Sequence, residues 1–246
     1  GVEGALGHRA LHPVDLVEHL HDRPATAVEG LAHAVHVLQP AVQRRDRGVD
    51  NAGIRRTAAN EHRVGLGVGD AGRWLAAMTD NERAYVDPER IALAGDSAGG
   101  NLAAVLANTS DTEPAAVVLL YPVTDLRGGT WGRLTRGVPL SVRSMEWFRG
   151  HYAGEAELSD PRLSPLLAAI PSRAPHFIVT CGHDPLAEEG VAYAGRVALH
   201  GAEVEHHHLP RHAHGLFTAA GKVATGRRLA EAAAAFLASR LGGGAG

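Results

Sequence analysis

The sequence has few of the features that mark secreted, membrane or nucleic-acid-binding proteins. A single cysteine, Cys181, occurs among 246 residues, which excludes an internal disulfide framework and is typical of a reducing, cytoplasmic location. No apolar run approaches the roughly 20 residues of a membrane-spanning helix, and the start lacks a signal-peptide pattern. The net charge of −3 gives no overall attraction to nucleic acid. We therefore expect a globular protein with neither a membrane span nor a nucleic-acid partner.

Aromatic residues are scarce, at 4% of the chain, and they are unevenly placed. Residues 1–69 contain no Phe, Tyr or Trp and no Gly-Gly pair, yet they are rich in His and Arg. From Asp70 onward the hydrophobic pattern becomes regular. We expect an atypical N-terminal segment of uncertain structure over 1–69, a folded core over 70–241 and a disordered tail over 242–246.

Apolar runs alternate with amphipathic segments throughout the expected core. The segments predicted to form strands are residues 90–95, 115–122, 175–182 and 202–210, and those predicted to form helices are 98–108, 188–202 and 226–241. Continuous apolar strands separated by helices are typical of a parallel sheet that is covered on both faces. The sequence therefore predicts an α/β protein.

A glycine-rich corner, GDSAG over residues 95–99, follows the first of these strands and precedes a helix. In this context G-x-S-x-G is typical of a nucleophile held on a tight strand-to-helix turn, here Ser97. The N-terminus of the next helix would point at the site, so the amide of Ala98 is a candidate oxyanion donor. The alternative is a chemically idle glycine-rich turn. The corner lacks the Lys-Ser/Thr of a phosphate-binding loop.

A serine hydroxyl is a weak nucleophile until a base removes its proton, and the base needs an orienting acid. Asp184 lies just beyond the third predicted strand, and His214 lies just beyond the fourth. The chain order Ser97, Asp184, His214 is that of serine hydrolases built on a parallel sheet. The alternative for both partners is an ordinary loop position.

Other polar residues compete for these roles. Asp125 is the best rival acid, because it follows the second predicted strand, and His183 and His212 are the rival bases. His206 and His208 share one face of an alternating strand, but no third ligand is evident, so we expect no metal site. Short basic stretches unaccompanied by aromatics do not indicate nucleic-acid binding.

Several blocks of the chain, in order, resemble the hormone-sensitive-lipase-like group of α/β-hydrolases, which includes bacterial carboxylesterases with a GDSAGGN elbow. The blocks that carry the resemblance are residues 85–104, 158–168, 182–205 and 212–217. It implies an α/β-hydrolase fold, hydrolysis of a small-molecule carboxylic ester, and no metal or organic cofactor. The oligomeric state is left open.

The resemblance also implies roles for individual residues. Ser97 would be the nucleophile, Asp184 the acid and His214 the base. Ala98 and Gly99 would belong to the elbow and its oxyanion site. A cap insertion would lie around residues 127–155, where Trp147 and Phe148 are candidates to line the acyl pocket; ordinary core packing of a cap helix is the alternative for these two aromatics.

The N-terminal part departs from the family pattern, because no His-Gly-Gly-Gly run precedes the elbow. In this family the backbone amides of that run supply most of the oxyanion hole. Residues 1–69 would then be a divergent segment that donates amides from elsewhere, 65–69 being the visible option, or an out-of-frame reading joined to an intact hydrolase. The third explanation is that the whole chain is a remnant that folds but hydrolyses poorly. A non-catalytic, ligand-binding relative is the alternative function, and an amidase would use the same three side chains.

Overall fold

The computed structural model describes residues 91–111, 113–133 and 139–241, and the predictions for 1–69 and 242–246 lie outside this part of the chain. The described residues form one four-stranded parallel sheet in the order β1-β2-β3-β4. The strands are β1 (Ala92–Asp96), β2 (Ala116–Leu120), β3 (His176–His183) and β4 (Val204–Ala213). Each overlaps a segment predicted to be a strand, and β4 ends three residues beyond its predicted end at 210.

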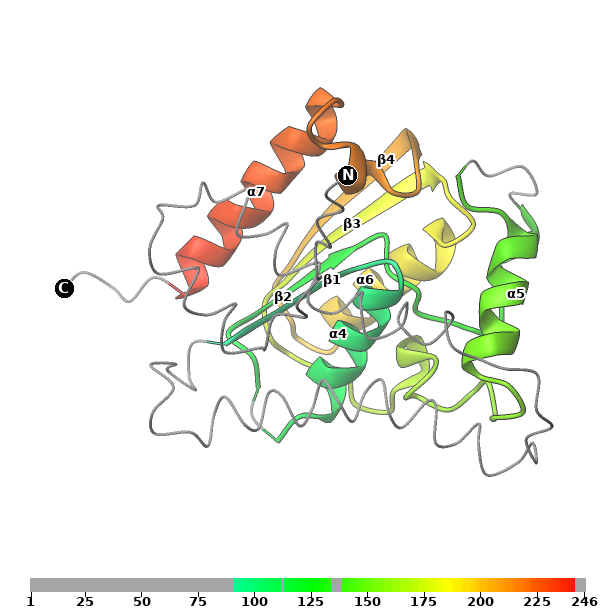
Figure 1. The fold of residues 1–246 in the computed structure, drawn as a ribbon. Helices are drawn as coiled ribbons and strands as arrows, with labels where there is room; N and C mark the ends of the chain where they lie inside the picture. The colour runs from blue at the N-terminus through cyan, green and yellow to red at the C-terminus, as the bar shows by residue number, and fades with distance from the viewer. Residues whose placement is uncertain (1–90, 112, 134–138, 242–246) are drawn as a thin grey trace, which may run out of the picture.

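Helices cover both faces of this sheet (Figure 1). The main helices are α4 (Ala98–Thr109), α5 (Val142–Tyr152), α6 (Ala187–Leu199) and α7 (Ala224–Leu241). Helices α4 and α6 pack on one face, where small and branched side chains meet the strands, while α7 packs on the other face. The predicted α/β class is confirmed, as is the alternation of strands with helices.

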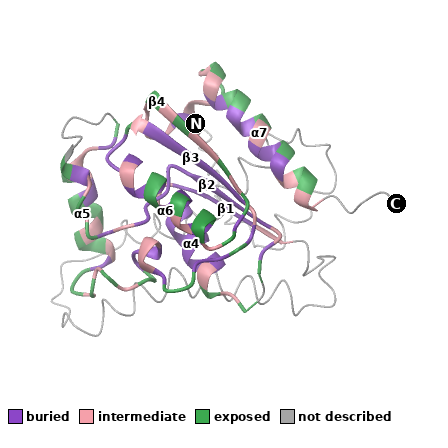
Figure 2. Ribbon diagram, turned by 180° about the vertical axis from the view of Figure 1, so that it is seen from behind, coloured by how far each residue is buried: buried purple, intermediate pink, exposed green. Residues whose placement is uncertain are grey.

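The burial of the strands follows their composition. Strand β2, with the sequence AVVLL, is buried at all five positions, because both of its faces are covered. Strand β4 forms an edge of the sheet, and none of its residues is fully buried (Figure 2). Its sequence, VEHHHLPRHA, carries polar side chains that a central strand would not tolerate.

The pairing of β3 with β4 becomes irregular at the carboxyl ends of both strands. Cys181 pairs with Leu209, but the next recorded pair is His183 with Ala213, so two further residues of β3 are matched by four of β4. A Cβ added at Gly182 would lie 2.4 Å from the carbonyl oxygen of Pro210, so the bulge requires glycine there. Such bulges bend a strand and re-aim the residues that follow it, which here lead directly to His214.

The segment between β2 and β3 forms a third apolar cluster at the carboxyl end of the sheet. It holds two 3-10 turns, η2 (Trp131–Arg133) and η3 (Pro165–Leu167), besides α5. Ser141 caps α5 through reciprocal hydrogen bonds with Ser144. Within the three ranges that the structure describes, no helix combines the length and the hydropathy needed to cross a lipid bilayer.

Candidate active site

Ser97 sits on a strained turn between β1 and α4. Its φ of 51° lies in the left-handed region, which non-glycine residues rarely adopt. The turn is tight enough that a Cβ added at Gly95 would lie 2.2 Å from the carbonyl oxygen of Gly99. One added at Gly100 would lie 2.8 Å from Cβ of Pro122. The sequence predicts that the tight turn requires glycine at positions 95 and 99; the close backbone approach confirms this for Gly95, and Gly100, just outside the motif, is also tightly packed.

The three side chains predicted to act together lie within hydrogen-bonding distance of one another. His214 Nε2 is 2.9 Å from Ser97 Oγ, and His214 Nδ1 is 2.7 Å from Asp184 Oδ2. The Asp184 side chain is 1% exposed, and its other oxygen accepts the backbone N–H of Leu186. With Nδ1–H donated to the carboxylate, Nε2 presents a lone pair to the hydroxyl. The arrangement can therefore deprotonate Ser97.

Tyr121, the first residue after β2, supports the imidazole from the side. Its ring centroid lies 4.7 Å from that of His214, and its hydroxyl donates to Asp96 Oδ2 at 3.3 Å. Burial, followed by the nearby Asp96 carboxylate, raises the pKa of the Tyr121 phenol well above its usual range. Tyr121 also has a positive φ, 39°, so backbone strain is present on both strands that flank the site.

The rival residues occupy other positions. Asp125 forms an ion pair with Arg127, two residues away, at 2.7 Å. Burial opposes ionisation of Asp125, but the hydrogen bonds from Arg127 outweigh it and hold the pKa of the carboxyl below its usual value. His183 is exposed, and the contacts with Ser97 and Asp184 are made by His214 rather than by His212.

Two of the four histidines of β4 share a neutral partner. His206 Nε2 and His208 Nδ1 each lie 2.9 Å from the Thr180 hydroxyl, on the sheet face that α6 covers. Burial, then the neighbouring His208 and His207, lowers the pKa of His206. Among the residues that the structure describes, no group of three or more His, Cys, Asp or Glu side chains is placed to hold a metal ion.

The remaining predicted site residues lie on two helices. Ala98 and Gly99 begin α4, and a first-turn N–H has no acceptor within its own helix, so the Ala98 amide is available to an oxyanion. Trp147 and Phe148 lie on α5, where their rings meet edge to face at 5.2 Å. They are 50% and 49% exposed, so they are not packed in the core of the described structure.

Two buried residues of the site were not predicted. Tyr121 carries a weak signal, an aromatic residue between the end of an apolar strand and a proline. Glu189 carries a clearer one, because it lies at helical spacing from Leu186 and Tyr193, on the buried face of α6. An acidic side chain on an apolar stripe indicates a specific polar partner.

A family model described as the α/β-hydrolase fold matches residues 56–218. The chain is 39% identical over 145 residues to an ethyl acetate hydrolase of Pseudomonas putida, covering 55% of this chain and 45% of that protein. It is 35% identical over 202 residues to the carboxylic ester hydrolase LipN of Mycobacterium tuberculosis, covering 74% of this chain and 53% of that one. The chain thus spans about half the length of these relatives.

The structure is also similar to solved structures. One is a thermophilic and thermostable carboxylesterase cloned from a metagenomic library, with a TM-score of 0.65 and 33% identity over 72% of this chain and 59% of that one. The predicted α/β-hydrolase fold is confirmed by the family match and by this similarity. The match of the family model begins at residue 56, before the predicted start of the core at Asp70.

Proposed function

The chain belongs to the α/β-hydrolase family, in its hormone-sensitive-lipase-like branch, and from that premise we propose that it hydrolyses small carboxylic esters through an acyl-enzyme on Ser97. The observation that carries the proposal is the pair of contacts made by His214, at 2.9 Å to Ser97 Oγ and at 2.7 Å to Asp184 Oδ2. The names of the relatives, an ethyl acetate hydrolase and a carboxylic ester hydrolase, support an ester as the substrate.

The proposed reaction uses these side chains and water. His214 Nε2 accepts the hydroxyl proton as Ser97 Oγ bonds to the carbonyl carbon, and the carbonyl oxygen becomes an oxyanion near the Ala98 amide. Collapse of this intermediate breaks the ester C–O bond, and the departing alkoxide takes the proton from His214. Water then attacks the acyl-enzyme, with His214 again as base, which releases the acid and restores Ser97.

The proposal also covers the cap, its two exposed aromatic residues and the cellular location. We assign residues 127–155 to a cap and the exposed pair Trp147 and Phe148 to its substrate-facing surface; their 50% and 49% exposure leaves their rings free to contact an acyl chain. We also propose a cytoplasmic location, because the chain has a single cysteine, Cys181, which is free and buried.

Hydrolysis of p-nitrophenyl acetate and butyrate by the purified chain tests the proposal. Ser97→Ala should abolish turnover, whereas Ser110→Ala, at the opposite end of α4, should leave it unchanged. A fluorophosphonate should label Ser97 covalently, with the modified peptide identified by mass spectrometry. Equal rates for the wild-type chain and Ser97→Ala would remove the proposal. A p-nitroanilide tested in parallel distinguishes an esterase from an amidase.

A ligand-binding, non-catalytic relative is the alternative, favoured by the lack of any Gly-Gly pair before the elbow. Loss of one oxyanion donor reduces kcat by roughly 100- to 1000-fold. This alternative predicts that the fluorophosphonate fails to label Ser97 and that esters bind without being cleaved.

A further inference from the structure

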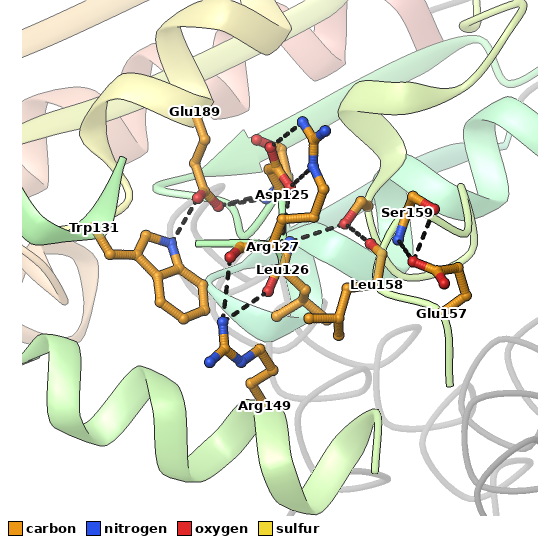
Figure 3. Close-up of polar contacts among 11 residues, drawn as sticks. Asp125, Leu126, Arg127, Trp131, Arg149, Glu157, Leu158, Ser159 and Glu189 are labelled. Carbon is orange, nitrogen blue, oxygen red and sulfur yellow. Dashed lines mark hydrogen bonds and ion pairs between the residues drawn. The ribbon is translucent and has the colours of Figure 1, made fainter. Parts of the chain in front are cut away.

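A second buried carboxylate, outside the three predicted catalytic side chains, lies five residues after Asp184. Glu189, in the first turn of α6, is 1% exposed. It accepts the backbone N–H groups of Thr124 at 2.8 Å and Asp125 at 3.2 Å, and the indole N–H of Trp131 at 2.7 Å (Figure 3). All three recorded donors are neutral N–H groups.

Removing this carboxylate from water costs free energy. Burial raises the pKa of Glu189 to about 8, although the three N–H donors favour the ionised form and oppose the increase. The other buried residues of α6 carry uncharged side chains or none: Ala187, Gly190, Tyr193, Ala194 and Val197. An apolar side chain would fill this position without the desolvation penalty, so packing alone does not explain an acid here.

The segment that Glu189 binds also holds the nucleophile. The N–H of Ser97 donates to the carbonyl of Leu120 at 2.9 Å, and the N–H of Val123 donates to the carbonyl of Ser97 at 3.2 Å. The Asn101 side chain of α4 donates to the carbonyl of Val123 at 2.9 Å. Residues 120–125 are therefore bonded to the elbow on one side and to Glu189 on the other.

The first turn of α6 in turn holds the acid. Asp184 Oδ1 accepts the N–H of Leu186 at 2.9 Å, and its backbone carbonyl accepts the N–H of Ala187 at 3.1 Å. Leu186 is itself buried in the third apolar cluster. A displacement of this turn would therefore move the carboxylate that accepts from His214.

The contact of Glu189 with Trp131 extends the same connection toward α5. The guanidinium of Arg149 lies 5.3 Å from the Trp131 ring and donates to the carbonyl of Arg127 at 3.2 Å (Figure 3). Glu189 is thus the point at which α6, the loop after β2 and the α5 region meet.

We propose that Glu189 is a positioning residue for ester hydrolysis, which fixes the loop of Asp184 to the segment that holds Ser97. It acts through hydrogen bonds to residues 124, 125 and 131 and does not touch the substrate. This inference rests on the function proposed above. It predicts that a defect at Glu189 reduces kcat, because it changes the alignment of the reacting groups, and leaves KM nearly constant.

The substitution Glu189→Gln tests this. Above pH 8 the wild-type side chain is ionised and accepts all three N–H groups, so the assay is run at pH 9 with the spontaneous hydrolysis subtracted. The amide of Gln keeps the shape of the side chain but directs an NH2 group at one of these donors. We expect kcat for p-nitrophenyl acetate to fall by about 100-fold, the effect of a misalignment on the order of 1 Å. Glu188→Gln, the adjacent and partly exposed acid on the same helix, is the matched control and should retain wild-type kcat.

A second variant separates misalignment from poor folding. Trp131→Phe removes the indole N–H, so in the double variant Glu189→Gln/Trp131→Phe the amide NH2 no longer faces that donor. We expect the double variant to have a kcat about 10-fold above that of Glu189→Gln alone. A double variant no better than the product of the two single defects would overturn the proposed geometry.

A readout that needs no turnover keeps this test independent of the proposed function. The Nδ1–H proton that His214 shares with Asp184 should give a far-downfield proton NMR signal in the wild-type chain and in Ser97→Ala. We expect Glu189→Gln to broaden or shift it. Equal turnover by Ser97→Ala and the wild type would disprove the proposed esterase function. The NMR signal would still test the positioning role of Glu189. A Glu189→Gln chain with wild-type kcat and signal, even if less stable, would overturn the positioning role.

Discussion

The two ends of the sheet are built differently. At the carboxyl end, both non-glycine residues with positive φ in the described part of the chain, Ser97 and Tyr121, follow adjacent strands. At the amino end, the loop before β3 is satisfied by ordinary turn contacts, such as the N–H of Ala174 donating to the Ser172 hydroxyl at 3.1 Å. Among the described residues, positive φ at non-glycine positions therefore occurs at the end where chemistry is proposed, which is the pattern expected when function opposes local stability.

At each end, burial strongly shifts the pKa of a titratable side chain, His176 at the amino end and Glu189 at the carboxyl end. At the amino end, burial lowers the pKa of His176 to about 4, and its Nδ1–H donates to the carbonyl of Ala174, two residues away. At the carboxyl end, Glu189 accepts from residues 58 to 65 positions distant. The local contact completes a turn, whereas the distant ones join three parts of the chain.

The largest expected effect is the loss of activity when Asp184, the acid at the carboxyl end of the sheet, is replaced. Asp184→Asn should reduce kcat by roughly 10⁴-fold, because the amide cannot hold the imidazole with its lone pair toward Ser97. Steady-state hydrolysis of p-nitrophenyl acetate measures this. Asp125→Asn, which removes a carboxylate paired within its own loop, is the control and should stay near wild-type activity. A reversed order of the two defects would assign the acid to Asp125.

The second prediction concerns the close packing at Gly95, in the strand-to-helix turn that carries Ser97. Gly95→Ala should lower the free energy of unfolding by about 3 kcal/mol or more, because its methyl group would lie 2.2 Å from a backbone oxygen that cannot move alone. It should also reduce kcat by shifting Ser97. Chemical denaturation and the esterase assay measure the two losses. A variant that keeps both stability and activity would show that the elbow is looser than described.

The third prediction concerns the pH dependence of stability, which should differ between the buried His176 at the amino end and the buried Glu189 at the carboxyl end. The pKa of His176 is about 4 in the folded chain, against an ordinary value of 6.5, so between these values the unfolded chain binds the additional proton. Stability is therefore lost as the pH falls from 6.5 toward 4, by on the order of 3 kcal/mol. His176→Asn should flatten this acid limb in a series of melting temperatures relative to the wild type.

The contribution of Glu189, at the carboxyl end of the sheet, to stability should change with pH in the opposite direction. The pKa of Glu189 is raised to about 8 from an ordinary 4.5, so its contribution to stability is fully present below pH 4.5 and is lost as the pH rises through 8. In the same series, Glu189→Gln should flatten the decline in stability between pH 6.5 and 8, above the range in which His176 titrates. A decline over this range that persists in the variant would assign it to another group.

Sequence patterns predicted the four strands, the helices α4, α6 and α7, and the grouping of Ser97 and Asp184 around His214, because strand ends, glycine corners and chain order are local signals. The bulge between β3 and β4 was not predictable, since it depends on the close approach of Gly182 to Pro210. The contact of Tyr121 with His214 depends likewise on a backbone conformation that alternation does not encode. The bulge and the Tyr121 contact were not predicted because both depend on contacts between residues far apart in the sequence.

The smallest effect compares two glycines on α6, one facing the sheet and one facing away. Gly195 is exposed with open space around its Cα, so Gly195→Ala should stabilise the chain by about 0.5–1 kcal/mol, because alanine loses less backbone entropy in a helix. At Gly190 an added methyl would lie 2.7 Å from the Thr180 side chain, on the same turn as Glu189. Gly190→Ala should therefore destabilise by about 1–3 kcal/mol. Thermal unfolding measures both. If the two variants shifted stability in the same direction, the packing of α6 against β3, on which the positions of Asp184 and Glu189 depend, would need revision.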